Sequence, residues 1–226
     1  MADEGEFGEA RQRMVEEQLV RRGIKDQRVL EAMGSLPREL FVPPDVRHLA
    51  YADAPLPIGF RQTISQPYIV ALMTELLELQ ESESVLEIGT GSGYQAAVLG
   101  RLARHASSLE VVPELASEAK ALLEQLGISN VEVIHADGSL GLAARAPFEA
   151  IIVTAAAPKV PSPLRDQLAD GGRMVLPIGG RDGQMLERWV RRGERTVRER
   201  VAPVAFVPLL GAFGWGPEEE TRGWWF

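Results

Sequence analysis

The sequence predicts an α/β fold with a doubly wound, mostly parallel sheet. Short apolar segments that are typical of buried strands alternate with amphipathic segments that are typical of helices between residues 84 and 177. A glycine-rich turn separates the first of these strands from the helix that follows it. Strands joined by crossover helices form a parallel sheet with helices on both faces. We expect N-terminal helices before this core and an antiparallel hairpin after it.

Length and composition favour one globular core. The chain has 226 residues, of which 45% are hydrophobic and 25% are charged. Cysteine is absent, which excludes disulfides, thiol nucleophiles and zinc motifs built on cysteine pairs. The three histidines, His48, His105 and His135, have no spacing typical of metal ligands. We therefore expect no metal.

Charge and hydropathy narrow the range of partners. The net charge of −8 argues against binding to the nucleic-acid backbone, which depends on Lys and Arg to neutralise phosphates. No apolar run approaches the ~20 residues of a membrane span, and the first nine residues are acidic where a secretory signal would be basic and then apolar. We expect a cytoplasmic monomer that binds neither nucleic acid nor membranes.

Two helices and a long connection are expected before the core. Apolar residues recur at helical spacing over residues 10–22, and Gly23 is a suitable C-cap. Asp26 can cap a second helix that extends through Met33. Between Pro37 and Gln62 the chain is interrupted by four further prolines, at positions 43, 44, 55 and 57, so we expect a long irregular connection there. A loop of this length is often functional, and a lid over the cleft is one role it could have.

The core elements follow in order. Helices are expected from Gln66 onwards and over residues 94–102, 113–126 and 162–169, and strands over residues 84–89, 107–112, 131–136, 150–155 and 173–177. Residues 185–210 alternate like one or two antiparallel strands with a turn near Gly193. We divide the chain into N-terminal helices and a covering loop (1–65), the α/β core (66–210) and a C-terminal extension (211–226) that contains Trp215, Trp224, Trp225 and Phe226.

The glycine-rich turn after the first strand is the strongest candidate for a binding site. Its residues 85–94 read VLEIGTGSGY, and such a turn lets a ligand contact backbone N–H groups. It departs from the dinucleotide fingerprint because Tyr94 occupies the sixth position, where a glycine or alanine is needed. Glu87, two residues before Gly89, can balance a cationic ligand such as the ammonium group of S-adenosylmethionine. A turn that serves packing alone is the less favoured interpretation.

Two later strand ends carry acidic candidates. Glu110 lies about twenty residues after Gly89 at the end of the next strand, where a carboxylate can accept both ribose hydroxyls of a nucleoside. Asp137 and Gly138 end the third strand and could contact an adenine edge. Because Asp-Gly is a common turn dipeptide, a plain turn is an equal alternative for this pair.

Ser65 lies just before the helix that precedes the first strand. On its own it reads as a helix N-cap, because Pro67 suits the first turn of a helix. No GxSxG motif and no neighbouring histidine supports a hydrolase triad.

Several segments together resemble the protein-L-isoaspartate O-methyltransferase family. They are residues 50–59 (AYADAPLPIG), 62–67 (QTISQP), 86–95 (LEIGTGSGYQ), 147–158 and 176–179. The resemblance extends from about Met14 to about Leu210. Class I methyltransferases in general share the glycine turn, whereas the Thr-Ile-Ser segment is more specific to this family. The resemblance implies a Rossmann-like fold and methyl transfer from S-adenosylmethionine to the free carboxylate of L-isoaspartyl residues in damaged proteins and peptides, which initiates their repair.

The resemblance also implies roles for individual residues. By position, Ser65 would be the active-site serine. Cofactor and substrate would both be contacted by Gln62, Thr63, Ile64 and Ser65. The amino acid portion of the cofactor would be contacted by Gly89, Gly91 and Ser92. The ribose would be bound by Glu110, and the adenine would be contacted by Asp137 and Gly138. Two positions depart from the usual family residues, Arg61 and Val111. The first could alter the entry of the substrate, and the second could alter the packing over the adenosine.

Three alternatives stay open from the sequence. A class I methyltransferase for another carboxylate substrate would share the glycine turn but has no reason to contain Thr-Ile-Ser. A NAD-binding oxidoreductase would need a small residue in place of Tyr94. A module that kept the fold and lost the chemistry is the non-enzyme alternative.

Overall fold

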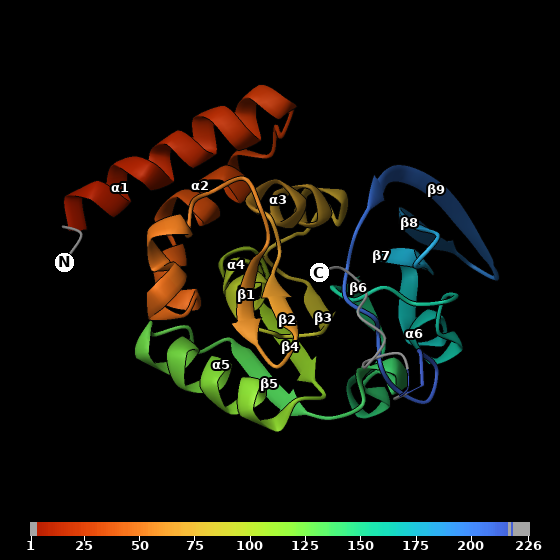
Figure 1. The fold of residues 1–226 in the computed structure, drawn as a ribbon. Coiled ribbons are helices and arrows are strands. Elements are labelled where there is room, and N and C mark those ends of the chain that lie inside the picture. Colours follow the sequence, from red (N-terminus) through yellow and green to blue (C-terminus); the bar gives the residue numbers. More distant parts are fainter. Residues whose placement is uncertain (1–3, 217, 219–226) are drawn as a thin grey trace.

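The computed structural model describes residues 4–216 and 218, in which a seven-stranded sheet is flanked by helices and accompanied by a two-stranded sheet (Figure 1). The order in the large sheet is β5-β4-β3-β6-β7-β8-β9. Neighbouring strands from β5 to β7 pair in parallel, and β8 and β9 add an antiparallel hairpin. The predicted fold class, with N-terminal helices and a C-terminal hairpin, is confirmed.

The core alternates strands and helices as the sequence predicts. Its elements are α3 (Pro67–Leu76), β3 (Ser84–Ile88), α4 (Tyr94–Leu102), β4 (His105–Glu110), α5 (Pro113–Gln125), β5 (Val131–His135), the 3-10 turns η5 (Gly138–Leu140) and η6 (Ala143–Arg145), β6 (Phe148–Val153), α6 (Ser162–Asp166), β7 (Leu168–Gly180), β8 (Gly183–Arg192) and β9 (Arg195–Val204). The prediction of a helix over 162–169 is too long. The chain leaves α6 after Asp166 because Leu168 is fully buried in the sheet and pairs with Phe148.

The N-terminal helices form one nearly continuous segment that begins earlier than predicted. It consists of α1 (Glu4–Arg13), a π-helical turn η1 (Met14–Leu19) and a 3-10 turn η2 (Val20–Arg22). It ends at Gly23, whose φ of +96° is a left-handed conformation that favours glycine. The second helix, α2 (Gln27–Ser35), is capped by Asp26, which accepts a hydrogen bond from the Arg28 backbone N–H at 2.9 Å.

The connection expected to be irregular contains short regular elements. Two 3-10 helices, η3 (Arg38–Phe41) and η4 (Pro44–Leu49), precede a hairpin of β1 (Leu56–Gly59) and β2 (Gln62–Ile64). Phe60 and Arg61 at its tip have φ of +50° and +56°, as a two-residue type I′ turn requires. Prolines are compatible with this hairpin because its strands have only one partner each.

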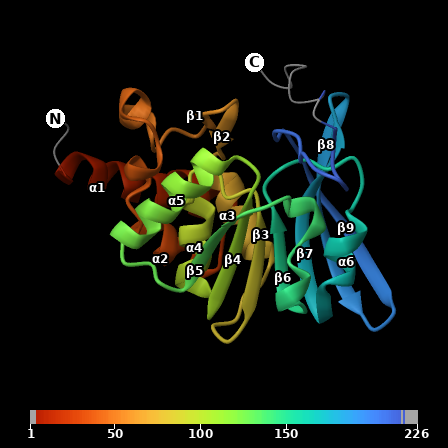
Figure 2. The same ribbon diagram turned by 90° about the horizontal axis from the view of Figure 1, so that it is seen from below.

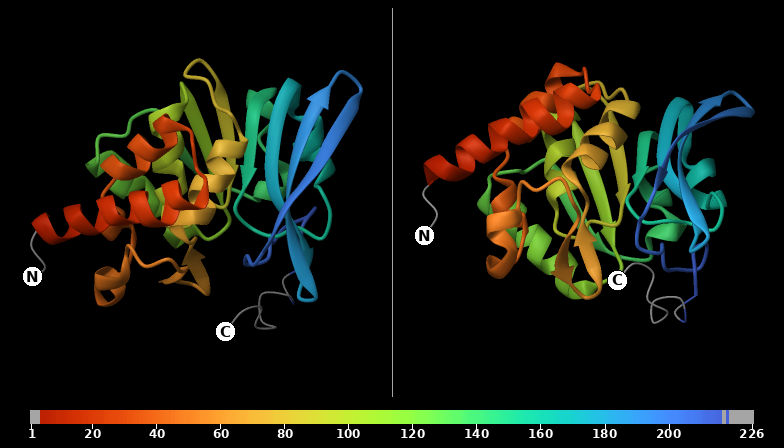
Figure 3. Two further views of the ribbon diagram at one scale, coloured as in Figure 1. Left: turned by 90° about the horizontal axis from the view of Figure 1, so that it is seen from above. Right: turned by 45° about the horizontal axis from the view of Figure 1, so that its top comes forward.

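The large sheet is buried on both faces. Successive residues of β6 alternate between two hydrophobic clusters: Ala150 and Ile152 belong to the first, whereas Ile151 and Val153 belong to the second. The first cluster also contains residues of α2, α3, α4 and α5, and the second contains Leu164 of α6. Figure 2 shows α4 and α5 on one side of the sheet and α6 on the other. The N-terminal helices (red and orange) and the C-terminal hairpin (blue) lie at opposite ends of the molecule (Figure 3).

Strand order places a crevice next to β3. The chain leaves β3 toward β4 and β5 and later returns on the opposite side of β3 to form β6. In open α/β sheets, ligands bind at the carboxyl ends of the strands where this direction reverses. The glycine turn follows β3 at this point, and Thr154 follows β6.

The segment that follows β9, residues 205–216, packs back against the core. Pro208 forms a bridge with Ala156, and the Trp215 indole N–H donates to the Ala156 carbonyl at 2.9 Å. Trp224, Trp225 and Phe226 of the predicted extension lie outside the described residues. Within residues 4–216 and 218, the structure contains no helix with the length and apolar character needed to cross a bilayer.

Candidate active site

The glycine turn has a backbone that other residues could not adopt without strain. Gly89, Gly91 and Gly93 have φ of +93°, +52° and +86°. A Cβ atom on Gly89 would lie 2.5 Å from the Thr154 hydroxyl oxygen, so the β3 and β6 ends approach too closely for a side chain. The Thr154 hydroxyl donates to the Gly89 carbonyl at 2.6 Å. The turn is therefore fixed from the β6 side.

Glu110 ends β4 beside the turn. One of its carboxylate oxygens accepts a hydrogen bond from the Gly91 N–H at 2.8 Å, and the other accepts from the Val112 N–H at 2.9 Å. Its side chain is 6% exposed and lines a pocket together with Gly89 and Gly91. Each carboxylate oxygen has a second lone pair, so the carboxylate that these two N–H groups hold in place can still accept hydrogen bonds from two ligand hydroxyls.

Three adjoining pockets meet at the carboxyl ends of β3 and β6. The first, which we call the turn pocket, is bordered by Gln62, Thr63, Gly89, Gly91, Glu110, Val111, Gly138, Thr154 and residues 207–210 among others. The second, the serine pocket, is bordered by residues 63–65, 70, 73, 89–92, 94, 95 and 154. The third, the groove, has a volume of about 440 Å³ and is bordered by residues 55, 63, 65, 66, 69, 154 and 203–207.

Ser65 lies on the border between two of these pockets. It contributes to the lining of the serine pocket and of the groove, whereas Thr63 and Thr154 contribute to all three. The hairpin brings it there, because Ser65 directly follows β2 and precedes α3. A molecule in the turn and serine pockets and a second molecule in the groove can therefore both approach Ser65.

Glu87 lies behind the turn. Its carboxyl group is completely buried and accepts a hydrogen bond from the Ser108 hydroxyl, which is 2.6 Å from the Thr90 hydroxyl. Burial raises the pKa of Glu87 to about 8, and the nearby Glu110 carboxylate adds to the increase. Glu87 does not border the turn pocket, the serine pocket or the groove. Glu87 is linked to the turn through the Ser108 and Thr90 hydroxyls.

Asp137 and Gly138 are placed differently from each other. Gly138 borders the turn pocket, whereas Asp137 does not. The Asp137 carboxylate accepts hydrogen bonds from the Ser139 N–H at 2.9 Å and from the Ala212 N–H at 2.8 Å. Asp137 therefore caps η5 and holds the segment that follows β9.

The structure brings most of the predicted site residues together. Gln62, Thr63, Ile64, Ser65, Gly89, Gly91, Ser92, Glu110 and Gly138 all border the turn pocket or the serine pocket. Of the two departures from the family pattern, Val111 borders the turn pocket and is 42% exposed, and Arg61 lies at the tip of the β1–β2 hairpin.

Sequence reasoning missed Thr154 and residues 207–210. Thr154 has a usable signal, because it is the first polar residue after an apolar strand at the position where the strand order reverses. Residues 207–210 have no local signal. They reach the site through hydrogen bonds between distant parts of the chain, such as the Leu209 N–H to the Ala156 carbonyl at 2.8 Å.

Comparison with known proteins identifies the family. The family model described as protein-L-isoaspartate(D-aspartate) O-methyltransferase matches residues 9–213. A protein-L-isoaspartate O-methyltransferase of Methanoregula boonei is 54% identical over 205 residues, which cover 91% of this chain and 94% of the relative. A protein-L-isoaspartate O-methyltransferase 1 of Syntrophobacter fumaroxidans is 56% identical over 209 residues, which cover 92% and 98%.

A solved structure gives the same result. It is described as a protein-L-isoaspartate O-methyltransferase of Plasmodium falciparum in complex with S-adenosyl-L-homocysteine. It matches with a TM-score of 0.77 at 26% identity and covers 88% of this chain and 98% of that one. With its glycine turn, its pinned Glu110 and a serine between two pockets, this chain belongs to the protein-L-isoaspartate(D-aspartate) O-methyltransferase family.

Proposed function

We propose that this protein transfers the methyl group of S-adenosylmethionine to the free carboxylate of L-isoaspartyl residues in damaged proteins and peptides. The methyl ester can close to a succinimide that reopens partly as normal aspartate, so the transfer initiates repair. The observation that carries the proposal is the position of Ser65 between the serine pocket and the groove, in a chain that matches this enzyme family over residues 9–213.

The residues around the glycine turn fit S-adenosylmethionine. The positive φ of Gly89 and Gly91 allows a ligand to approach the backbone, and Glu110 has free lone pairs for two ribose hydroxyls. Contacts would also come from Gln62, Thr63, Ile64, Ser65, Ser92 and Gly138, which border the same pockets. When bound, the cofactor supplies a methyl group on a positively charged sulfur. Glu87 and Asp137 do not border these pockets, so they would support the residues that do: Glu87 is linked to the turn through Ser108, and Asp137 holds the segment after β9.

The substrate needs orientation rather than a base. An isoaspartyl carboxylate is ionised near pH 7 because the ordinary pKa of an aspartyl carboxyl group is about 3.9. The protein must therefore hold a carboxylate oxygen in line with the methyl group, and such orientation contributes roughly 7–11 kcal/mol in well-aligned reactions. In this proposal the Ser65 hydroxyl donates a hydrogen bond to the substrate carboxylate and holds it in that line.

The groove suits a peptide. Its volume of about 440 Å³ admits several side chains, and its walls come from α3 and from residues 203–207 at the end of β9. The isomerised residue would place its carboxylate at Ser65 while the rest of the peptide lies along these walls. A small carboxylic acid would leave most of the groove unfilled.

Methyl transfer tests this proposal directly. We expect the protein to transfer label from S-[methyl-³H]adenosylmethionine to a peptide that contains L-isoaspartate and not to the same peptide with normal aspartate. Equal labelling of both peptides would favour another carboxyl methyltransferase. Absence of labelling together with quenching of NADH fluorescence on binding would favour an oxidoreductase.

The remaining expectations are part of the same proposal. A repair enzyme that acts on many proteins needs access to them in the cytoplasm, and the net charge of −8 disfavours nucleic acid as a partner. Light scattering after gel filtration is expected to give the mass of a monomer, 24.7 kDa.

A further inference from the structure

Arg38, the first residue of η3, is a buried cation that has no carboxylate partner in the part of the chain that the structure describes. Its side chain is 0% exposed. Its Nε donates to the Ala50 carbonyl at 2.7 Å, and its Nη2 donates to the Ser65 carbonyl at 2.7 Å. The Cζ atom lies 4.8 Å from the centre of the Tyr94 ring. Among the described residues, its Nη1 has no hydrogen-bond partner.

This arrangement costs stability. Burial lowers the pKa of Arg38 to about 10, which means that the folded state disfavours the charged form. Replacing buried charges by apolar side chains of similar volume is often neutral or stabilising. An arginine at this position is therefore hard to explain by stability alone, and its two carbonyl partners indicate what else it does.

The two carbonyls lie at the two ends of the segment that covers the site. Ala50 follows η4, Ser65 follows β2, and the β1–β2 hairpin lies between them. Tyr94, against which the guanidinium packs, is the first residue after the glycine turn and borders the serine pocket with Ser65. One rigid, planar guanidinium thus links both ends of the covering segment to the helix that follows the turn.

We propose that Arg38 is a positioning residue for the methyl transfer, which holds the Ser65 main chain so that the Ser65 hydroxyl meets the substrate carboxylate. The proposal rests on the proposed function in one respect, namely that Ser65 contacts the substrate. Arg38 itself does not border the turn pocket, the serine pocket or the groove. Its influence on the site therefore passes through the residues that it contacts, of which Ser65 is the proposed active-site serine.

The outer side of the covering segment has a separate attachment. The Gln66 side chain donates to the Asp53 carboxylate at 2.7 Å, and Arg22 pairs with the same carboxylate at 3.0 Å. These contacts do not involve Arg38. Loss of the Arg38 side chain should therefore loosen the placement of Ser65 without detaching the whole segment.

Hydrogen exchange tests the structural half of this proposal. We compare Arg38→Met with Arg173→Met, because Arg173 is a second buried arginine that contacts none of the covering segment. Arg38→Met should speed amide exchange in residues 50–66 by about fivefold or more and leave residues 77–83 unchanged, and Arg173→Met should do the reverse. Unchanged exchange in residues 50–66 of Arg38→Met would overturn the proposal.

A double-mutant cycle tests the functional half. A displacement of about 1 Å can cost on the order of 100-fold in rate, so we expect Arg38→Met to lower kcat for an isoaspartyl peptide by about 20-fold or more. The Kd for S-adenosylhomocysteine should change by less than about threefold. In a Ser65→Ala background the same substitution should cost less than about threefold, because the group that it positions is gone. An equal loss of kcat in both backgrounds would contradict the proposal.

Two outcomes need a separate measurement: a variant that does not fold, and a wild-type protein without methyltransferase activity. If Arg38→Met does not fold, Arg38→Lys replaces it in both experiments, because lysine keeps the charge but lacks the planar fork that reaches two carbonyls. Its loss of kcat should again vanish with Ser65→Ala, and an equal loss in both backgrounds would again be contradictory. If the wild-type protein methylates no isoaspartyl peptide, the proposed function fails, and the exchange experiment alone decides whether Arg38 holds Ser65.

Discussion

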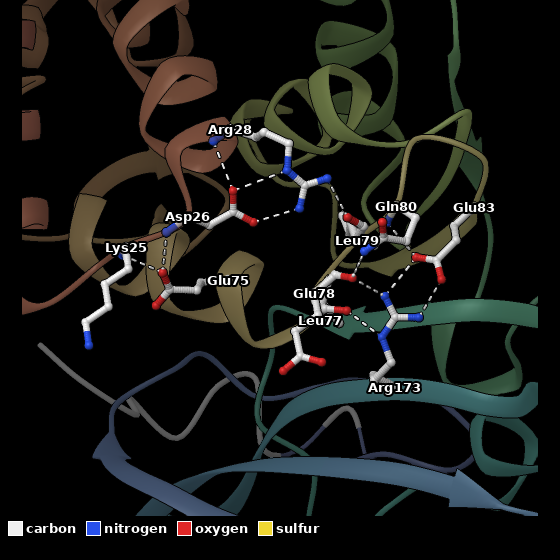
Figure 4. A network of polar contacts seen from close by, with 10 residues as sticks. All are labelled: Lys25, Asp26, Arg28, Glu75, Leu77, Glu78, Leu79, Gln80, Glu83 and Arg173. Atoms are coloured by element: carbon white, nitrogen blue, oxygen red, sulfur yellow. Dashed lines mark hydrogen bonds and ion pairs between the residues drawn. The ribbon is translucent and has the colours of Figure 1, made fainter.

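Among the residues that the structure describes, two arginines are buried, and they are used in different ways. Arg173 on β7 donates all five of its N–H groups: two to the Glu83 carboxylate, at 2.7 and 2.8 Å, and three to backbone carbonyls. Figure 4 shows the bonds to Glu83, Leu77 and Glu78. Arg38 donates to two carbonyls, of Ala50 and Ser65, and no carboxylate of residues 4–216 or 218 pairs with it. The first arginine joins parts of the scaffold away from the pockets. The second is placed where the site is assembled.

Two acids, the half-buried Glu83 and the fully buried Glu87, show the same contrast. Burial by itself would raise the pKa of Glu83, but Arg173 outweighs this effect and the pKa falls below its usual value. Glu87 behind the glycine turn has no cationic partner among the described residues, and burial raises its pKa to about 8. The scaffold thus pairs its carboxylate with an arginine, whereas at the site Arg38 keeps its charge without a carboxylate among the described residues and Glu87 binds a proton. We expect loss of Arg173 to act mainly on stability and loss of Arg38 mainly on activity.

The largest effect is expected from breaking the scaffold pair. Arg173→Met removes the donor to the Leu77 and Glu78 carbonyls and leaves the half-buried Glu83 carboxylate with the Gln80 N–H but without its cation. We expect a loss of about 3 kcal/mol of unfolding free energy, the lower end of the range for breaking a buried pair. Urea denaturation measures this loss. The kcat of the folded variant should stay within about twofold of the wild-type value. A large loss of kcat with normal stability would show that Arg173, and not only Arg38, serves the site.

The next effect is a pH dependence that comes from Glu87. Because its pKa in the folded state, about 8, lies above its ordinary value, the folded state binds a proton that the unfolded state lacks between about pH 4.5 and 8. Its stabilising effect is therefore complete below about pH 4.5 and lost as the pH rises through 8. We expect this loss to be on the order of a few kcal/mol.

Glu87→Gln is the matched control for this pH dependence, since glutamine has nearly the same shape and does not titrate. Urea denaturation at several pH values from 5 to 9 should show the decline in the wild-type protein and a smaller one in the variant. Parallel curves would show that Glu87 does not titrate in this range.

Ser65→Ala should lower kcat for an isoaspartyl peptide by about 100-fold, or ~2.7 kcal/mol, the size of the loss when one positioned hydrogen-bond donor is removed. The Kd for S-adenosylhomocysteine, measured by calorimetry, should stay nearly constant because Glu110 and the glycine turn are intact. Wild-type turnover in this variant would remove Ser65 from the mechanism.

Glu110→Ala should act on binding instead of orientation. It removes the carboxylate that is held by the Gly91 and Val112 N–H groups, so the affinity for S-adenosylmethionine should fall by ~1–3 kcal/mol. Glu110→Gln keeps one acceptor oxygen and should lose less. Calorimetry that shows unchanged affinity for Glu110→Ala would reject the ribose contact.

The smallest effect is expected on the stability of Arg38→Met. Two hydrogen bonds are lost, to Ala50 and Ser65, but the cost of burying an uncompensated charge also disappears. The unfolding free energy should fall by less than about 1.5 kcal/mol. A loss as large as that of Arg173→Met would show that Arg38 serves the scaffold.

Local patterns predicted the parts of the fold that depend on neighbouring residues. The alternation of apolar strands and helices located β3, α4, α5 and β6, because burial on both faces demands continuous apolar segments. The glycines at 89, 91 and 93 predicted the turn, because its positive φ angles favour glycine. The predicted strand at 107–112 lies two residues too late, since β4 begins at His105.

Contacts between distant residues could not be predicted in this way. The β1–β2 hairpin was not predicted, because prolines in this part of the sequence argue against strands. Its turn residues, Phe60 and Arg61, are also not the usual ones for positive φ. The link from Arg38 to Ser65 joins residues that are 27 positions apart. Asp137 was considered for adenine contact, but its bond to Ala212 depends on where the last segment packs. Only the assembled structure shows such contacts.

The central claim is that the glycine turn and Ser65 bring a methyl donor and a substrate carboxylate together. Its most direct test is a crystal structure of the protein with S-adenosylhomocysteine and an isoaspartyl peptide. We expect the ribose hydroxyls on Glu110, the nucleoside beside Gly89 and Gly138, and the peptide carboxylate within hydrogen-bond distance of the Ser65 hydroxyl. A nucleoside bound elsewhere, or a carboxylate remote from Ser65, would contradict the account.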